Sequence, residues 1–207
     1  PQVFFPGWFF AKKIIIFDLA EVYLTGMKDF EYVLEKIIKI PASSIKKQLK
    51  DIALIDLFHG KISEEDYWKR MISRNKWNVD IDLLKKLIRK NFKEIEGTRD
   101  LIKRLKNKEY KLGLLSVHAK EWIEYCEKKF DYHKLFDSVL YSFDASALKN
   151  GKVIFELILE KLDAKPEQCI FIDDVQGNLD IAKSLGIDTI IFKNSDQLEK
   201  ELKLLDI

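Results

Sequence analysis

The chain has few of the residues that cross-link or loosen a polypeptide, since its 207 residues include two cysteines, eight glycines and four prolines. Cys126 and Cys169 have neither CxxC spacing nor histidine neighbours, which argues against a thiolate metal site and is typical of free thiols in a reducing cytoplasm. Scarce glycine and proline, with 47% hydrophobic and 34% charged residues, exclude disorder, collagen-like repeats and flexible linkers. The composition therefore predicts a compact, ordered, soluble protein.

The chain also lacks an excess of charge of either sign. Its 36 basic and 34 acidic residues give a net charge of +2, which favours a mixed solvated surface over a nucleic-acid-binding stripe. No apolar run reaches the roughly 18 residues that a bilayer span needs, because Asp18 ends the run after Phe17. The aromatic stretch 1–10 has neither a preceding basic segment nor a small-residue cleavage site, so it does not resemble a signal peptide. We expect a cytoplasmic protein with no nucleic-acid or membrane partner.

Short apolar runs that alternate with helical periods dominate much of the remaining sequence. Ile14 to Phe17 are β-branched or aromatic throughout and predict a strand that is buried on both faces. Further strands are predicted at 110–115, 138–143, 169–172 and 189–192, with helices at 98–106, 119–130, 153–162, 178–185 and 196–204. Alternation of this kind predicts an α/β fold with a doubly wound parallel sheet.

The stretch from about Met27 to Asn91 breaks the alternation, because it shows only helical spacing. Ser63 and Asp66 lie three residues apart and resemble the capping box at a helix start. Helices are predicted at 29–40, 43–58, 63–73 and 81–91. The sequence therefore predicts a small four-helix insertion at 27–94, between core segments 1–26 and 95–207.

Polar residues follow the predicted strands in a fixed order. Asp18 ends the first strand, Ser116 ends the next, Lys149 precedes a late helix, and Asp173 and Asp174 end another strand. Taken singly, Asp18, Ser116 and Lys149 are ordinary cap or loop residues. The adjacent carboxylates are less ordinary, because they repel each other unless a cation or basic group offsets their charge. Strand ends of this kind are where open parallel sheets place chemistry.

The segments that carry these residues resemble the four motifs of the haloacid dehalogenase (HAD) superfamily. They read IIIFDLAEVYL, LGLLSVH, KNGKVIFELILEKL and CIFIDDVQGNLDIAKSLGI, and the resemblance spans residues 12–193. The segment FHGKISEEDYW is also similar to the helical cap of members whose insertion follows the first motif. Among these members, the chain looks most like the sugar-phosphate phosphatases.

The resemblance implies a role for each matching residue. Asp18 would attack the electrophile, while Ser116 and Lys149 would hold the transferring phosphoryl group, with Val117 beside them in the substrate site. The implied Mg²⁺ ligands are Asp18, the backbone carbonyl of Ala20 and Asp174. Asp173 would either share the ion or support the site from behind. The expected activity is Mg²⁺-dependent hydrolysis of a small phosphomonoester through an aspartyl phosphate.

The chain departs from the family pattern at Ala20, where phosphatases usually carry an aspartate that protonates the leaving group. Glu21 is the neighbouring carboxylate, but residues 18 and 20 share a face in extended backbone and residue 21 points away. The loss predicts a slow phosphatase, a long-lived phospho-aspartate or a preference for a good leaving group.

Two alternatives therefore stay open. A 2-haloacid dehalogenase would use Asp18 on a halogenated substrate without metal, although Val22 and Val117 differ from the residues that those enzymes prefer. A catalytically weakened phosphate-binding protein is the other alternative. His118 is a candidate substrate contact. A histidine at this place in a sequence is, however, more often a residue at a helix start or at the surface. Substrate identity and oligomeric state are not readable from the sequence.

Overall fold

The computed structural model describes residues 14–207, so the aromatic stretch 1–10 lies outside it. Five parallel strands form one sheet in the order β3-β2-β1-β4-β5. This confirms the predicted parallel α/β sheet. The strands are β1 (Ile14–Phe17), β2 (Lys111–Ser116), β3 (Ser138–Tyr141), β4 (Cys169–Asp173) and β5 (Asp188–Ile191).

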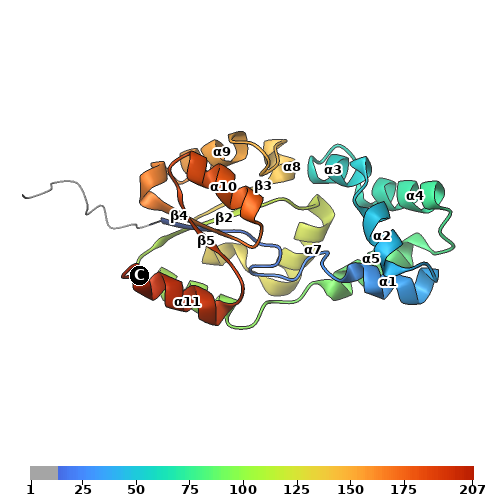
Figure 1. The fold of residues 1–207 in the computed structure, drawn as a ribbon, viewed down its shortest axis with the longest axis horizontal. Coiled ribbons are helices and arrows are strands. Elements are labelled where there is room, and N and C mark those ends of the chain that lie inside the picture. Colours follow the sequence, from blue (N-terminus) through green and yellow to red (C-terminus); the bar gives the residue numbers. More distant parts are fainter. Residues whose placement is uncertain (1–13) are drawn as a thin grey trace, which may run out of the picture.

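Helices cover both faces of the sheet, as Figure 1 shows. Alternate residues of β1 supply two separate cores: Ile15 and Phe17 pack on one face, and Ile14 and Ile16 on the other. Strands buried in this way need apolar residues at every position. One face is covered by α6 (Thr98–Asn107), α7 (Lys120–Phe130) and α11 (Ser195–Leu204), and the other by α8 (Ser142–Ala145), α9 (Val153–Lys161) and α10 (Gln176–Ser184).

The strand predicted at 138–143 is shorter than expected. It ends at Tyr141, and Ser142 begins the short helix α8. The apolar pattern continues across this boundary because Phe143 stacks on Tyr141, with ring centroids 5.2 Å apart. Hydrophobicity alone therefore does not reveal where the strand stops.

The insertion contains five helices and not the four predicted. They are α1 (Phe30–Ile38), α2 (Ala42–Leu49), α3 (Ile52–Phe58), α4 (Glu64–Asn75) and α5 (Ile81–Asn91). The helix expected at 43–58 breaks at Lys50 and Asp51. Asp51 adopts extended backbone and its side chain accepts a hydrogen bond from the Ala53 amide at 3.0 Å, which is the geometry of a helix N-cap. The cap expected at Ser63 is present, since its hydroxyl accepts from the Asp66 amide at 3.1 Å.

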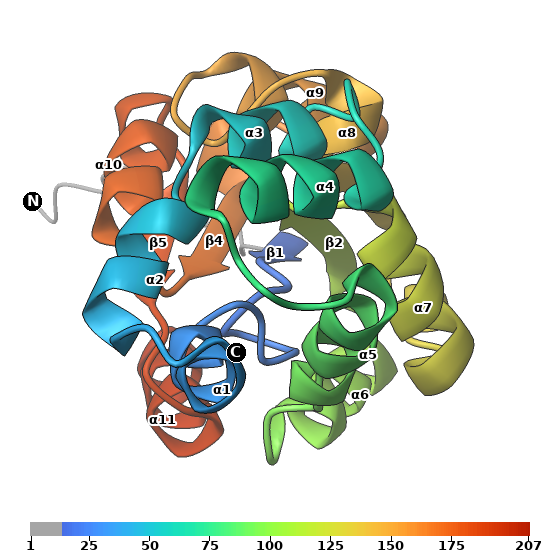
Figure 2. The ribbon, with the colours of Figure 1, turned by 90° about the vertical axis from the view of Figure 1, so that its right-hand side faces the viewer.

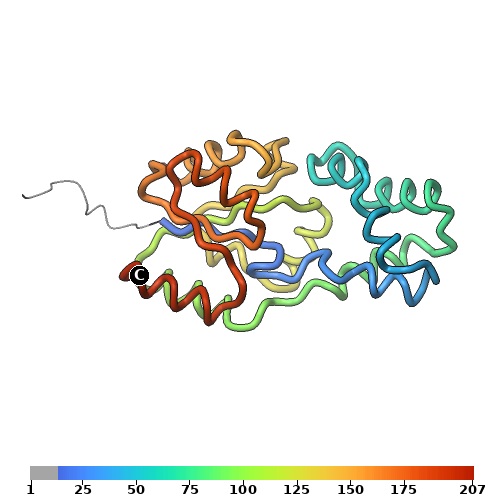
Figure 3. The backbone as a smooth tube through the Cα atoms, in the orientation of Figure 1, coloured from blue at the N-terminus to red at the C-terminus, as the bar shows by residue number. Residues whose placement is uncertain are grey.

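The insertion lies at one end of the sheet, beyond the carboxyl end of β1, as Figures 1 and 3 show. Tyr67, Trp68 and Trp77 are buried in its core. Arg89 of α5, which is partly buried, forms an ion pair with the buried Glu64 at 2.6 Å. The Glu64 amide in turn donates to Glu121 of α7 at 3.0 Å, which joins the insertion to the core.

A second contact joins the insertion to the core near β2. The Ser142 hydroxyl donates to the Phe58 carbonyl at 2.6 Å and accepts from the His118 amide at 3.1 Å. In the end-on view of Figure 2, α3 and α4 lie in front of the strands. Within residues 14–207, no helix has the length and apolar character that crossing a bilayer requires.

Candidate active site

Three carboxylates meet at the ends of β1 and β4. These strands are neighbours in the sheet, with Phe17 paired to Ile172, and the chain leaves them in opposite directions across the sheet. Such a switch point in strand order is where open α/β sheets bind ligands. Asp18, Asp173 and Asp174 each offer an oxygen there, and these oxygens lie within 4.8 Å of one another. The structure thus brings Asp18 next to Asp173 and Asp174, which lie at least 155 positions later in the sequence.

Lys149 reaches this cluster from the loop before α9. Its Nζ lies 2.6 Å from Asp18 Oδ2 and 2.5 Å from Asp173 Oδ2. The Lys149 side chain is only 4% exposed, and a buried ammonium needs such carboxylate partners to offset its desolvation. The predicted site lysine is therefore part of the cluster and not a solvated loop charge.

Asp173 is occupied by groups of the protein. Its Oδ1 accepts from the Val175 amide at 2.8 Å, and Asn178 Nδ2 lies within 3.1 Å of both carboxylate oxygens. Lys149 takes the remaining side of Oδ2. Asp174, in contrast, has no ion-pair partner within residues 14–207 and is only half-buried. Asp173 therefore orients the loop and Lys149, whereas Asp174 is free to bind a ligand.

The cluster is short of positive charge. One ammonium faces three carboxylates, so the ionised cluster would carry two uncompensated negative charges in a largely buried place. Burial raises the pKa of Asp18 to about 7, with Lys149 opposing the shift and Asp173 adding to it. Burial and the charges of Asp173 and Glu21 also raise the pKa of Asp174. A divalent cation would restore the balance, because carboxylate oxygens are the ligands that Mg²⁺ prefers.

Ser116 stands at the same edge of the sheet, at the last residue of β2. Its neighbour in the register is Tyr141, and two residues earlier Leu114 pairs with Phe17. Ser116 is fully buried, and its hydroxyl has no hydrogen-bond partner in the described part of the chain. A buried hydroxyl without a partner is costly unless a ligand supplies one.

The loop after Asp18 has an unusual backbone. Glu21 adopts a left-handed conformation with φ of 60°, which non-glycine residues seldom adopt without compensation. Its carboxylate Oε1 accepts from the Gly26 amide at 2.7 Å, and its own amide donates to the Leu24 carbonyl at 2.7 Å. These bonds hold the loop in place. The Asp18 carboxylate is held in the same loop by the Leu19 amide at 2.6 Å.

A cavity of about 400 Å³ opens over the cluster. Asp18 faces this cavity, so a substrate would reach Asp18 through it. The insertion contributes Phe58 to the cavity wall. Val117 is among its lining residues, whereas Ser116 is not. The lining residues are Asp18, Ala20, Glu21, Phe58, Val117, Leu148, Lys149, Asn150, Asp174, Val175 and Asn178. Asn150 was not singled out in the sequence, and Phe58 appeared there only as the first residue of the cap-like segment FHGKISEEDYW, because nothing local marks either residue as part of a cavity wall.

His118 stands just before the start of α7, one of the two positions expected from the sequence, but it is not at the surface. It is 4% exposed and its ring contacts the rings of Phe58, Phe92 and Trp122, with centroids 5.6 to 6.5 Å away. Its Nδ1 accepts from the Ala119 amide at 3.1 Å. Burial lowers the pKa of His118 to about 4. The residue is therefore neutral near pH 7 and packs between the insertion and the core.

Replacing His118 by asparagine is expected to make the protein less sensitive to acid. Asparagine can still accept from the Ala119 amide but does not titrate. Between the ordinary pKa of 6.5 and the native value of about 4, the unfolded chain binds a proton that the native protein does not, so stability falls as the pH falls through this window. The histidine should account for at most about 3 kcal/mol of the unfolding free energy that is lost on acidification. Urea unfolding at about pH 7 and pH 4.5 measures how much free energy of unfolding each protein loses between the two pH values. An equal loss in the wild type and in His118→Asn would contradict the prediction.

Comparison with known protein families agrees with the resemblance seen in the sequence motifs. Residues 15–192 match the model for haloacid dehalogenase-like hydrolases. The chain belongs to this family. The motifs quoted from the sequence had implied this membership, and the HAD assignment now covers most of the described chain.

Curated relatives include proteins named for phosphate hydrolysis. The chain is 32% identical over 141 residues to a phosphorylated carbohydrates phosphatase of Thermotoga maritima, covering 66% of this chain and 59% of that protein. It is 23% identical over 195 residues to flavin mononucleotide hydrolase 1 of Arabidopsis thaliana, covering 94% and 78%. The chain thus spans 66% and 59% of the lengths of the first two curated relatives it matches.

Solved structures share the fold. A HAD family enzyme of Bacteroides thetaiotaomicron, crystallised with magnesium and inorganic phosphate, superimposes with a TM-score of 0.75 at 20% identity, covering 88% of this chain and 94% of that one. A HAD-like family hydrolase of Porphyromonas gingivalis gives 0.75 at 23% identity, covering 95% and 99%. This HAD-like hydrolase therefore has the fold of its family along nearly its full described length.

Proposed function

We propose that this HAD-like hydrolase is a Mg²⁺-dependent phosphatase that cleaves a small phosphomonoester through an aspartyl phosphate. The observation that carries the proposal is the charge of the cluster, in which Asp18, Asp173 and Asp174 face the single ammonium of Lys149. An anionic phosphate could not approach such a cluster unless further positive charge were present. Relatives named as phosphatases support the same chemistry.

Each residue of the cluster has a distinct part in the proposed reaction. The Asp18 carboxylate, held by the Leu19 amide and Lys149, would attack phosphorus and displace the alkoxide, which would take its proton from solvent because Ala20 offers none. Water would then cleave the aspartyl phosphate, releasing phosphate and restoring Asp18. Lys149 would neutralise charge on the phosphoryl oxygens. The Ser116 hydroxyl, which is buried without a partner and is not part of the cavity lining, would have to turn toward the substrate to donate to one of them. Asp173, with Asn178 behind it, would keep Lys149 aimed at the reacting phosphoryl group.

The residues present fit a hard divalent cation. Asp18 and Asp174 would hold Mg²⁺ together with the Ala20 backbone carbonyl, since all three residues line the same cavity. Asp173 would support the site from behind, because its two oxygens already bind protein groups. When bound, the ion would offset carboxylate charge and withdraw electrons from the phosphoryl group. Binding would also favour the ionised form of Asp18, which burial disfavours.

The insertion at 27–94 would act as a cap. Phe58 at the end of α3 lines the cavity, and Ser142 joins this helix end to the core. A cap of this kind would exclude bulk water while the phosphoryl group is transferred. The core would then consist of the segments before residue 27 and after residue 94.

Replacing Ala20 by aspartate is expected to raise phosphatase activity by roughly 10²- to 10⁴-fold, the usual contribution of a positioned acid/base. Ala20 lines the cavity beside Asp18, whereas the Glu21 carboxylate is bound to the Gly26 amide. The gain should be largest for substrates with poor leaving groups. Rates on an alkyl phosphate and on p-nitrophenyl phosphate measure this difference. Equal activity of A20D and wild type on both substrates would mean that no acid/base is missing.

The decisive assay compares p-nitrophenyl phosphate, sugar phosphates and 2-chloropropionate, each with Mg²⁺ and with EDTA. Phosphate release that EDTA abolishes is the expected result. Chloride release that ignores EDTA would instead identify a dehalogenase acting through the same aspartate. Absence of both activities, with phosphate binding retained, would identify a weakened phosphate-binding protein.

A further inference from the structure

The side chain of Glu21 lines the active-site cavity, although the sequence suggested that it points away. That expectation assumed extended backbone after Asp18. Glu21 instead has a φ of 60°, and with this left-handed backbone its side chain shares the cavity lining with Asp18 and Ala20. Backbone conformations that non-glycine residues seldom adopt cluster at functional sites. The cavity therefore contains a carboxylate that an extended loop would direct elsewhere.

The carboxylate of Glu21 lies beside Ala20, the position at which phosphatases of this family usually carry an aspartate. A Cβ atom added to Gly26 would lie 3.2 Å from Glu21 Oε1 and 3.3 Å from the Ala20 Cβ. The carboxylate thus adjoins the methyl group from which an aspartate at position 20 would extend. Asp174 also lies near, since its pKa is raised by burial and by the charges of Asp173 and Glu21.

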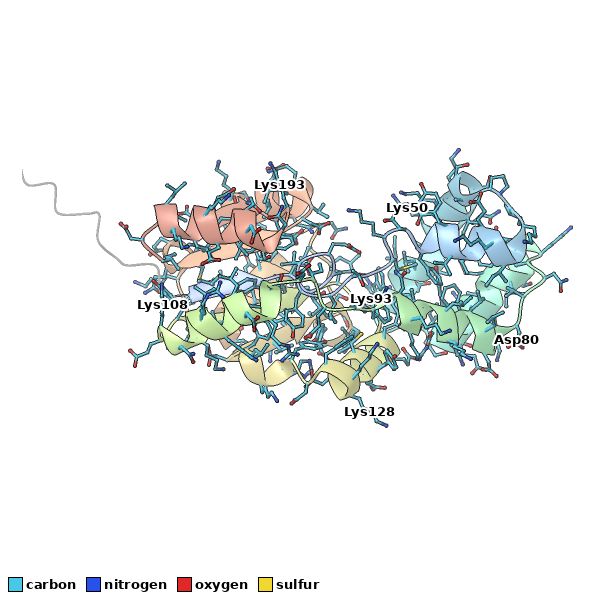
Figure 4. All side chains as sticks on the ribbon, turned by 90° about the horizontal axis from the view of Figure 1, so that it is seen from below. Lys50, Asp80, Lys93, Lys108, Lys128 and Lys193 are labelled. Carbon is cyan, nitrogen blue, oxygen red and sulfur yellow. The ribbon has the colours of Figure 1, made fainter. Side chains whose placement is uncertain are left out.

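One oxygen of the Glu21 carboxylate is held by the protein and the other is open. Oε1 accepts from the Gly26 amide at 2.7 Å. Gly26 belongs to a connection between core and insertion, because the Thr25 amide next to it donates to the Lys93 carbonyl at 2.8 Å, and Figure 4 shows Lys93 between these two parts. Oε2 bonds no group of residues 14–207 and is accessible to solvent. It is therefore free to bind water in the cavity.

We propose that the open oxygen of Glu21 holds the water molecule that cleaves the aspartyl phosphate. The proposal rests on the phosphatase function proposed above. Glu21 accepts a hydrogen bond from this water and so turns the water oxygen toward phosphorus. As that oxygen attacks, the bond between phosphorus and the Asp18 oxygen breaks, and its electron pair returns to the carboxylate. One proton of the water passes to a phosphoryl oxygen, so that dihydrogen phosphate leaves.

This role differs from that of the missing aspartate. An acid at position 20 would protonate the departing alcohol, whereas Glu21 acts after the alcohol has left. Displacing a reacting group by about 1 Å can cost roughly 100-fold in rate, so a water that is no longer held should react slowly. Loss of Glu21 should therefore slow only the second half of the reaction.

The test uses Glu21→Gln, which removes the open acceptor and keeps the loop. The glutamine oxygen can still accept from the Gly26 amide, while its NH₂ group, a donor, takes the place of Oε2. With p-nitrophenyl phosphate and Mg²⁺, rapid mixing should show a burst of about one p-nitrophenolate per chain, as expected when a covalent intermediate accumulates. The burst rate should stay within about twofold of the wild type, while the later steady rate falls by roughly 10- to 100-fold.

Two further readouts separate this role from a merely structural one. In Glu21→Gln, kcat and KM should fall together and leave kcat/KM unchanged, because kcat/KM reports only the steps up to departure of the alcohol. Mass spectrometry of the acid-quenched variant should find more phosphorylated protein than in the wild type. Glu96→Gln is the matched control, because Glu96 is an exposed glutamate that does not line the cavity. It should leave both phases unchanged.

Three results would overturn the proposal. An equal loss of burst rate and steady rate in Glu21→Gln would make Glu21 a residue that only holds the loop. An unchanged steady rate would mean that the water is held by another group. Recovery of the steady rate at high Mg²⁺ would mean that Glu21 acts on the ion. A wild type that releases no phosphate from any phosphomonoester would refute the phosphatase function itself, and this proposal with it.

Discussion

Replacing Asp18 by asparagine is expected to lower phosphatase activity by roughly 10⁴-fold or more, as removal of a nucleophile usually does. The amide cannot form the covalent intermediate and no other described carboxylate occupies the end of β1. The free energy of unfolding should not fall, because the change removes a buried carboxylate whose pKa burial raises to about 7. Steady-state rates and urea unfolding, both with Mg²⁺ and with EDTA, measure these two effects separately.

Asp180→Asn is the matched control for that substitution. Asp180 lies exposed on α10, where it accepts a hydrogen bond from Gln176, so the same change of group there should leave activity intact. Retention of more than about a hundredth of the activity in Asp18→Asn would be far more than loss of a nucleophile allows. Such a result would remove Asp18 from the covalent role.

Replacing Lys149 by methionine is expected to lower the free energy of unfolding by about 3–5 kcal/mol in EDTA, because breaking a buried ion pair leaves the partner charge uncompensated. The change would leave Asp18 and Asp173 facing each other at the ends of neighbouring strands without the ammonium that lies within 2.6 Å of both. Activity should be lost as well. Mg²⁺ should restore part of the stability, since it supplies positive charge to the same carboxylates.

Lys152→Met is the control for Lys149→Met, because Lys152 is an exposed lysine of the same loop. It tests whether loss of any lysine from this loop lowers the free energy of unfolding. This variant should unfold within about 0.5 kcal/mol of the wild type. If Lys149→Met is equally stable, the carboxylates must be neutral in the native protein. In that case the negative charge that we attribute to the cluster would not exist.

Much of the core could be predicted from the sequence because its strands are buried on both faces. Continuous apolar runs such as Ile14 to Phe17 are seldom anything else when they end abruptly at a polar residue. The break between α2 and α3 could not be predicted in the same way. Leu49, Ala53 and Leu57 are all buried and keep helical spacing across it. The periodicity therefore continues although α2 ends at Leu49 and Asp51 caps the start of α3.

The site was predictable to the extent that it lies at strand ends. Asp18 and Asp173 follow strands that pair with each other, so their proximity follows from the order of the sheet. The burial of His118 between three aromatic rings depends on where the insertion packs, which no local pattern reveals.

The hydroxyl of Ser142 has a consequence for how products leave. It bonds at once to the Phe58 carbonyl and to the amide of His118, next to Val117 in the cavity wall. Movement of α3 away from the core must break the first of these bonds, and the freed hydroxyl can then leave the second. Under the phosphatase function proposed above, displacement of α3 would thus loosen the wall beside Val117 at the same time, and the rate of product release should depend on Ser142 although it does not line the cavity.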